Sequence, residues 1–216
     1  MRLISADGVK SDARDLIQRH RLSGQLARRP ALLLLTRLLL FGLAYCATVG
    51  ELHAQRIEVD AGVGNYVDIV GVGFGTDDLK RWSIGGNWSI SLYAMAWGAY
   101  WRGNAEHDLA DLSVAPVVRL ENRMGSAFAP YLEASIGLHL LSHTQINEIR
   151  QFSTAFQFGE FLGAGVAFGN NYRYNIALRV QHVSNGGIKN PNDGLTYGAL
   201  VFQYQFPERE SGADSK

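Results

Sequence analysis

From about residue 56 onward, apolar and polar residues alternate in short segments separated by Gly, Asn and Asp. We count eight segments, at about 56–63, 66–75, 86–102, 109–121, 127–141, 154–168, 172–184 and 195–206. Neighbouring side chains of a strand point to opposite faces, so a period of two indicates strands rather than helices. Eight strands of about ten residues predict an all-β fold, the eight-stranded antiparallel transmembrane β-barrel of the outer membrane.

The alternation separates an apolar face from a polar face. On 172–184, Leu178 and Val180 share the first face, whereas Arg179 lies on the second. Charges of both signs share the polar face and could compensate one another in a small lumen; they are Glu58, Asp60, Arg119, Glu133 and Arg179. His139 has the same parity, and we expect it to join this polar network.

Aromatic residues cluster near segment ends on the apolar face, as membrane-interface girdles do. They are Tyr172, Tyr174, Phe202, Tyr204 and Phe206. Parity alone leaves the orientation of 66–75 and 86–102 open, because Trp97 and Trp101 lie opposite other apolar residues. A soluble lipid-binding barrel is the alternative, and it would bury these Tyr and Phe rows.

The first part of the chain differs from the rest. Basic residues up to Arg29 precede an apolar run at 31–50, and Ala54 offers a small residue for cleavage, as in a bacterial export signal. An arginine interrupts the run and leaves an apolar stretch shorter than the roughly 20 residues that a membrane helix needs. The alternative is an inner-membrane anchor. We expect residues 1–54 to be a removed signal peptide with a long N-terminal extension, and 55–216 to be one barrel domain.

Composition excludes several classes of function. The formal net charge is zero, so nothing points to nucleic acid as a partner. Cys46 is the single cysteine and cannot form an internal disulfide. No Cys/His spacing resembles a zinc site.

The candidate chemistry lies in HVSNGGIKNPNDG, residues 182–194. His182 and Ser184 share one face of a strand, roughly 6.5 Å apart along it, which suits a base and its nucleophile. The plainer interpretation is turn chemistry after a strand. With both termini in the periplasm, the seventh segment ends at the outer surface. The pair would then face the lipopolysaccharide leaflet, where the acyl esters of lipid A are the nearest substrates.

This stretch closely resembles the signature of the outer-membrane lipid A 3-O-deacylases of the PagL type. The resemblance extends to YLEASIGLHLLS at 131–142 and FLGAGVAFG at 161–169. It implies an outer-membrane serine esterase that hydrolyses the ester-linked 3-hydroxyacyl chain at the 3-position of lipid A, without metal or cofactor. By the same resemblance His182 is the base and Ser184 the nucleophile. Asn192 supports the oxyanion together with backbone N–H groups of the bend at Asn185 and Gly186.

The sequence departs from the family at Thr196, where the family has the acid that orients the histidine. A triad without its acid loses the group that stabilises the imidazolium. Glu160 is our candidate replacement, because it has the parity of the apolar face on the preceding segment. Counting back from the turn places it beside Val180, diagonal to His182. The alternative is a glutamate at the membrane interface that contacts solvent or a cation.

The missing acid also supports a second class of function, a non-enzymatic barrel that serves as an adhesin or structural protein. The expected partners are lipid A or lipopolysaccharide as substrate and the lipids of the outer membrane. Whether the protein forms a homodimer is left open by the sequence.

Overall fold

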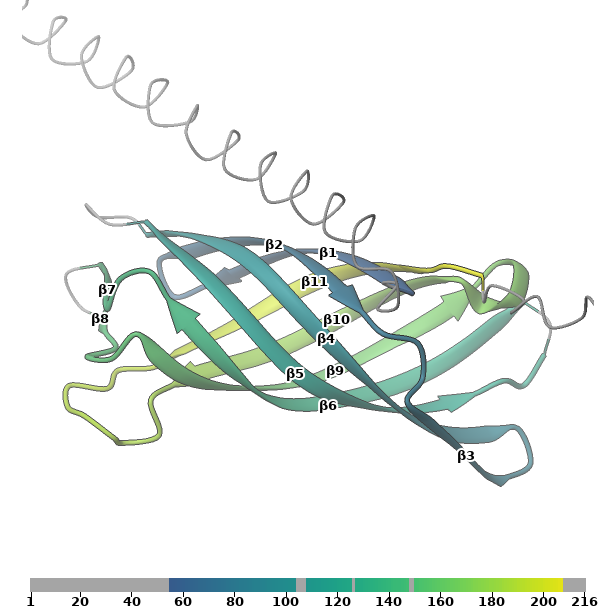
Figure 1. Ribbon diagram of the computed structural model, residues 1–216. Helices are drawn as coiled ribbons and strands as arrows, with labels where there is room; N and C mark the ends of the chain where they lie inside the picture. Colours follow the sequence, from purple (N-terminus) through teal and green to yellow (C-terminus); the bar gives the residue numbers. More distant parts are fainter. Residues whose placement is uncertain (1–54, 104–107, 126, 148–149, 208–216) are drawn as a thin grey trace, which may run out of the picture. The chain divides into compact units, whose positions relative to one another are not determined.

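The computed structural model describes residues 55–103, 108–125, 127–147 and 150–207, and the predicted leader lies outside them. Eight antiparallel strands form the barrel (Figure 1). They are β1 (Arg56–Gly64), β2 (Val67–Gly75), β4 (Trp88–Gly103), β5 (Leu109–Asn122), β6 (Phe128–Leu141), β9 (Phe156–Phe168), β10 (Tyr174–Ser184) and β11 (Leu195–Gln205). The smaller elements are β3 (Lys80–Gly85), β7 (Gln145–Asn147), β8 (Arg150–Gln151) and the 3-10 turn η1 (Asn170–Tyr172).

The sheet runs β2-β1-β11-β10-β9-β6-β5-β4, and pairing of β2 with β4 closes it into a ring. Closure satisfies the backbone N–H and C=O groups between strands, which hydrocarbon requires of a spanning sheet. Each of the eight predicted segments holds one barrel strand, so the predicted fold class is confirmed. No helix in the described part of the chain is long and apolar enough to cross a membrane.

The apolar face of the barrel points outward. Ile136 is 72% exposed and Leu178 70% exposed, whereas Arg179 and Glu58 are buried. The girdle residues Phe202 and Tyr174 are also exposed. A soluble barrel would bury these rows, so the arrangement is that of a wall surrounded by lipid.

The lumen is filled by a network of paired charges. Arg179 contacts Glu58 at 2.8 Å and Glu133 at 3.0 Å, and Arg119 contacts Glu133 at 2.9 Å. Arg119 also donates to the Asn175 side chain at 2.8 Å. Burial of these charges is tolerable because each has partners of opposite sign. The predicted compensation within the lumen is confirmed for Glu58, Arg119, Glu133 and Arg179, whereas no ion pair of Asp60 is seen among the described residues.

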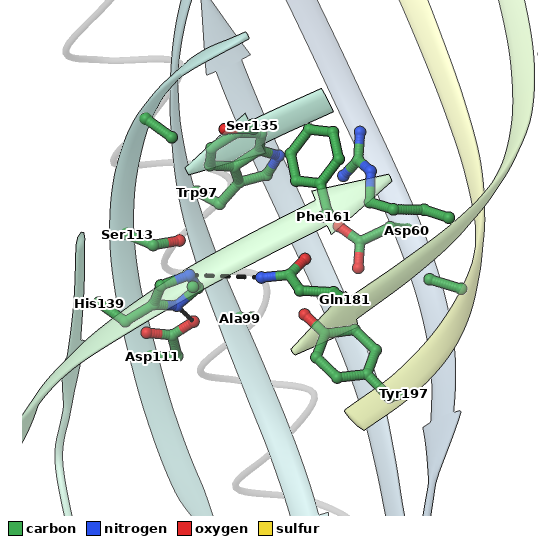
Figure 2. A pocket seen from close by; sticks show the side chains of 14 residues that line it. Asp60, Trp97, Ala99, Asp111, Ser113, Ser135, His139, Phe161, Gln181 and Tyr197 are labelled. Carbon is green, nitrogen blue, oxygen red and sulfur yellow. Dashed lines mark hydrogen bonds and ion pairs between the residues drawn. The ribbon is translucent and has the colours of Figure 1, made fainter. Parts of the chain in front are cut away.

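A small cavity remains in the lumen beside this network (Figure 2). His139 Nδ1 lies 2.7 Å from Asp111 Oδ2, and His139 Nε2 lies 3.3 Å from the Gln181 amide nitrogen. The cavity measures about 20 Å³, room for roughly one water molecule. His139 therefore belongs to the internal polar network, as predicted, and this space is too small to conduct solutes.

The orientation of β4, which the sequence left open, is settled by its large side chains. Tyr93, Met95 and Trp101 are buried in the lumen, and Trp97 donates from Nε1 to Glu58 at 2.8 Å. β4 places no charged side chain in the lumen, and these four large residues fill that space instead.

Two predictions near the β9–β10 turn are wrong for one reason. Tyr172 belongs to η1 rather than to a strand, and it packs partly buried against the cluster around Tyr131 instead of joining the lipid-facing girdle. Its φ of 56° takes the chain out of the extended conformation. The β9–β10 connection therefore includes Tyr172 and Arg173. Phe168 pairs with Tyr174, and the register of the hairpin shifts by two residues from the predicted one.

We predict that Glu133→Leu lowers the free energy of unfolding by about 3–5 kcal/mol, because it leaves Arg119 and Arg179 without a shared buried partner. Denaturant unfolding in detergent micelles measures this loss. Asp68→Asn is the matched control, since the Asp68–Arg102 pair is exposed and such pairs contribute less than about 1 kcal/mol. Equal effects of the two changes would show that the lumenal network contributes no more than a surface pair.

Candidate active site

His182 and Ser184 end the outward row of β10, and both side chains are half-buried. Tyr174 begins the same strand in the aromatic girdle. Ten residue steps of about 3.3 Å, tilted by about 40°, correspond to a height of about 25 Å, which equals the apolar band of such barrels. The pair therefore lies at the opposite membrane boundary from the girdle. This end carries the long connections 142–155 and 185–194, as extracellular ends do.

His182 has a direct cross-strand neighbour on each side. Thr196 of β11 pairs with it, and the distance from His182 Nδ1 to Thr196 Oγ1 is 2.8 Å. Glu160 of β9 pairs with it on the other side, so the predicted position of Glu160 beside Val180 is wrong and Leu162 lies there instead. The cause is the two-residue shift at η1. The correction brings Glu160 closer to His182 than the sequence indicated.

Glu160 is exposed on the lipid-facing surface, and Ile136 is its neighbour on β6. Within the described residues, no hydrogen bond or ion pair is recorded for its carboxylate. Thr196, not Glu160, is therefore the hydrogen-bond partner of the imidazole in this structure. Any effect of Glu160 on His182 would act through charge rather than through a hydrogen bond.

Ser184 pairs with Phe158 across β9, and Phe156 packs edge-to-face on Phe158 with ring centroids 5.1 Å apart. These rings form an exposed apolar surface beside the hydroxyl. The contacts recorded for the described residues include no hydrogen bond between Ser184 and His182. Such bonds are often long without substrate and tighten when it binds.

The loop after Ser184 is organised by Asn185, which is fully buried. Its side-chain amide donates to the carbonyls of Phe152 at 2.8 Å and Lys189 at 2.7 Å, and its Oδ1 accepts from the Gly187 N–H at 2.9 Å. Its backbone N–H donates to Asn192 Oδ1 at 3.0 Å. The oxygen of Asn192 is thus engaged, which turns its NH₂ group away from Asn185.

A second segment, residues 150–152, holds the loop 185–194 in place through hydrogen bonds. The Asp193 carboxylate accepts from the Gln151 N–H at 2.7 Å, and the Asp193 N–H donates to the Gln151 carbonyl at 3.2 Å. Arg150 donates to the carbonyl of Gly194. The segment 150–152 therefore supports the site from about 30 residues away in sequence, and no local pattern identifies it.

The position of the His182 imidazole requires a glycine at residue 194. Its φ is +56°, and a Cβ there would lie 2.9 Å from His182 Cε1. Any other residue would be strained in its backbone and would press on the ring. A glycine twelve residues after the histidine thus sets the ring position, a role that turn chemistry alone does not reveal. No group of three His, Cys, Asp or Glu that could hold a metal ion occurs in the parts described.

Fold and site together define an outer-membrane β-barrel with a polar, lipid-facing site at its rim. The comparisons with known proteins then identify the family. Residues 68–205 match the family model of the lipid A 3-O-deacylase (PagL). This chain belongs to that family.

Two relatives are both named lipid A deacylase PagL. The protein of Bordetella bronchiseptica is 32% identical over 166 residues, which cover 74% of this chain and 89% of the relative. The protein of Pseudomonas aeruginosa is 30% identical over 171 residues, covering 76% and 96%. A crystal structure of the outer-membrane enzyme PagL superposes with a TM-score of 0.63 at 27% identity, over 71% of this chain and 99% of that one.

We predict that Gly194→Ala lowers turnover by about tenfold or more, because a methyl group 2.9 Å from His182 Cε1 displaces the ring and misplacing a catalytic group costs rate. The positive φ should also lower the free energy of unfolding by about 1 kcal/mol. The assay is release of hydroxy fatty acid from lipid A, the reaction for which the family is named. Gly198→Ala is the control, because nothing lies within 4 Å of a Cβ at that position. Wild-type turnover in the Gly194 variant would show that the ring tolerates the displacement.

Proposed function

We propose that this protein hydrolyses the ester-linked 3-hydroxyacyl chain at the 3-position of lipid A in the outer leaflet, as a serine esterase. The observation that carries the proposal is the His182–Ser184 pair on the lipid-facing row of β10, at the rim that bears the long loops. An ester at the boundary between sugar and acyl chains would lie at this height. Membership of the family supports the same reaction.

In the proposed mechanism, Ser184 Oγ attacks the ester carbonyl while His182 Nε2 takes the hydroxyl proton. The Asn192 NH₂ group and the Gly186 N–H would stabilise the oxyanion, each such donor contributing about 3–4 kcal/mol when ideally placed. Collapse releases the sugar hydroxyl, which receives the proton from His182. Water, activated by the same imidazole, then frees the hydroxy fatty acid from Ser184. Asn185 would hold the loop that carries these donors.

Orientation and charge stabilisation of the imidazole would come from different residues. An N–H at His182 Nδ1 can donate to the Thr196 hydroxyl, which leaves Nε2 free to accept the serine proton. Thr196 brings no negative charge to the imidazolium. Glu160 is a direct cross-strand neighbour, and unit charges about 6 Å apart attract by about 3 kcal/mol at an effective dielectric constant near 20. Glu160 is therefore the proposed counter-charge.

A non-enzymatic barrel is the second candidate, and the threonine at position 196 favours it. The two functions differ in one measurement, the mass of lipid A from cells with and without the protein. Loss of the mass of one 3-hydroxyacyl chain supports the esterase. Unchanged lipid A, with the protein shown to be folded in the outer membrane, supports the non-enzymatic barrel.

We predict that Ser184→Ala and His182→Ala each abolish this mass change while the barrel keeps its stability. Both side chains lie outside the lumenal core, so their truncation opens no cavity there. Heat-modifiable migration on a gel checks folding, and mass spectrometry of lipid A checks activity. Persistent deacylation in either variant would remove that residue from the proposed mechanism.

We predict that Glu160→Gln lowers turnover about tenfold or more, which corresponds to about 1.4 kcal/mol of transition-state stabilisation. Thr196→Glu should be tolerated or raise turnover, because it returns an anion to the Nδ1 side of the ring. Turnover is measured on purified lipid A in detergent.

Asp193→Asn is the matched control for charge, because an asparagine oxygen can still accept from the Gln151 N–H. We expect it to be nearly silent. A damaging Asp193→Asn with a silent Glu160→Gln would place the counter-charge in the loop. If neither change matters, the site works as a His–Ser dyad oriented by Thr196.

A further inference from the structure

The β3–β4 hairpin projects beyond the neighbouring strands at the end of the barrel opposite the site (Figure 1). β3 pairs only with β4 and stands outside the closed ring. Three large apolar residues are exposed on it: Trp82 by 44%, Ile84 by 54% and Trp88 by 44%. Apolar side chains gathered on one projecting hairpin indicate a contact surface rather than a random exposure.

The register places this surface on the lipid-facing side of the wall. Trp82 pairs with Ile90 of β4, and Ile90 pairs with Leu120 of β5. One step further into the barrel, Leu92 pairs with the outward residue Val118. Trp82 therefore continues the row of outward side chains, and Trp88 has the same parity on β4.

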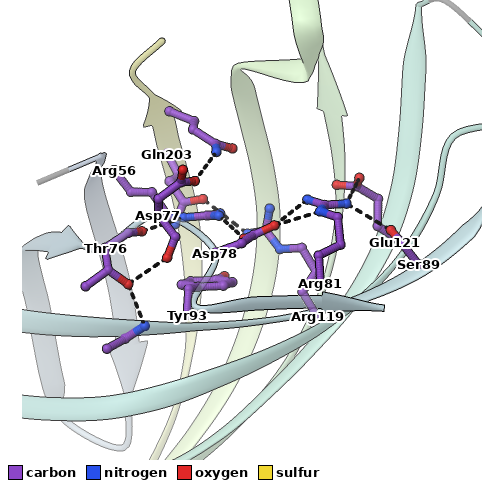
Figure 3. A network of polar contacts seen from close by, with 12 residues as sticks. Arg56, Thr76, Asp77, Asp78, Arg81, Ser89, Tyr93, Arg119, Glu121 and Gln203 are labelled. Carbon is purple, nitrogen blue, oxygen red and sulfur yellow. Dashed lines mark hydrogen bonds and ion pairs between the residues drawn. The ribbon is translucent and has the colours of Figure 1, made fainter. Parts of the chain in front are cut away.

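The other face of the hairpin is polar and is fastened to the barrel (Figure 3). Arg81 forms ion pairs with Asp78 at 2.7 Å and Glu121 at 3.5 Å, and it donates to Ser89 Oγ at 2.9 Å. Asp78 in turn binds Arg56 at the start of β1. These contacts lie on the inner face of the hairpin, so its apolar face points outward.

The hairpin lies just outside the aromatic girdle, on the side of the lipid headgroups. Each step to a neighbouring strand changes the height by about 3 Å, and two residues along a strand change it by about 5 Å, for strands tilted by about 40°. Two strand steps and two residues separate Trp88 from Phe128, through Asn122 on β5. These displacements oppose each other, so Trp88 lies at about the height of Phe128. Two further strand steps lead from Phe128 through Phe168 to the girdle residue Tyr174, which places Trp88 about 6 Å farther from the membrane centre than Tyr174.

We propose that the outer face of the β3–β4 hairpin, formed by Trp82, Ile84 and Trp88, is a membrane-contact surface that docks on the phospholipids of the inner leaflet, at the boundary between headgroups and acyl chains. Indole side chains prefer this boundary. Lys80 has the same outward parity, and its long side chain can reach a lipid phosphate while its stem stays on apolar surface.

A second copy of the chain is the other conceivable occupant, through the free edge of β3. Features of the strand oppose edge pairing. β3 has six residues, and its register is interrupted between Ser83 and Gly85. Lys80 and Arg81 lie on it, and lysine and irregular pairing are devices by which edge strands avoid further pairing. The continuity with the lipid-facing wall therefore favours lipid.

The test uses the intrinsic fluorescence of the protein folded into phosphatidylcholine vesicles. The chain has four tryptophans, of which Trp97 and Trp101 belong to the lumen. We expect phosphatidylcholine with bromine atoms near the headgroup end of its chains to reduce emission about twofold, and lipid brominated near the chain ends to reduce it less, because interfacial indoles lie at headgroup depth. In Trp82→Phe/Trp88→Phe most of this quenching should be lost.

Trp97→Phe is the matched control, and it should leave the depth profile of quenching unchanged. Two results would overturn the proposal. Emission that ignores bromine but is quenched by aqueous iodide would place the hairpin in water. Emission that resists both quenchers, with a dimer in sedimentation that Trp82→Arg dissociates, would make a second copy the occupant.

Discussion

Charge pairing inside the lumen is the constraint on which the barrel depends. An eight-stranded wall that turns its apolar side chains to lipid must place its polar side chains in an interior too narrow for bulk water. Arg179 meets this condition by contacting both Glu58 and Glu133, and Arg119 shares Glu133 with it. With that space filled, substrate chemistry has no room inside. This favours the proposed site, which lies on the outside of the wall at its rim.

At the rim, one part of the site lies on the paired strand β10 and the other part lies in the loop 185–194. His182 is held on a strand paired on both edges, which keeps the imidazole at a constant height relative to the membrane. In the proposed mechanism the oxyanion donors come instead from the loop 185–194, because a paired strand has no free N–H groups to offer. Asn185 and the clamp from 150–152 give that loop several hydrogen bonds of its own. Preorganised donors are what such a site requires, since they need no rearrangement as charge develops.

The sequence predicted the strands and their faces well, because a period of two leaves each residue only two choices. The register was harder. A turn that looked complete at Asn171 also takes in Tyr172 and Arg173, and this moved Glu160 by two residues relative to His182. The clamp of Asp193 by Gln151 was not predicted, because it joins loops that are distant in sequence and carry no periodic pattern. The β3 strand was missed for a related reason: it lies between the predicted segments 66–75 and 86–102, and only its pairing with β4 makes it a strand.

The threonine at position 196 changes how the imidazole is supported, in the proposed mechanism. A carboxylate hydrogen-bonded to Nδ1 selects the tautomer and stabilises the imidazolium at the same time. Here the hydroxyl of Thr196 can do only the first. A charge on the opposite strand can do the second without touching the ring, and it acts more strongly at a lipid boundary than in water because the surroundings are less polarisable. Glu160 has that position, and an anion on this lipid-facing row costs free energy that a neighbouring imidazolium would offset. Orientation and charge, joined in one acid in a Ser-His-acid triad, would then be divided between two strands that flank the same histidine.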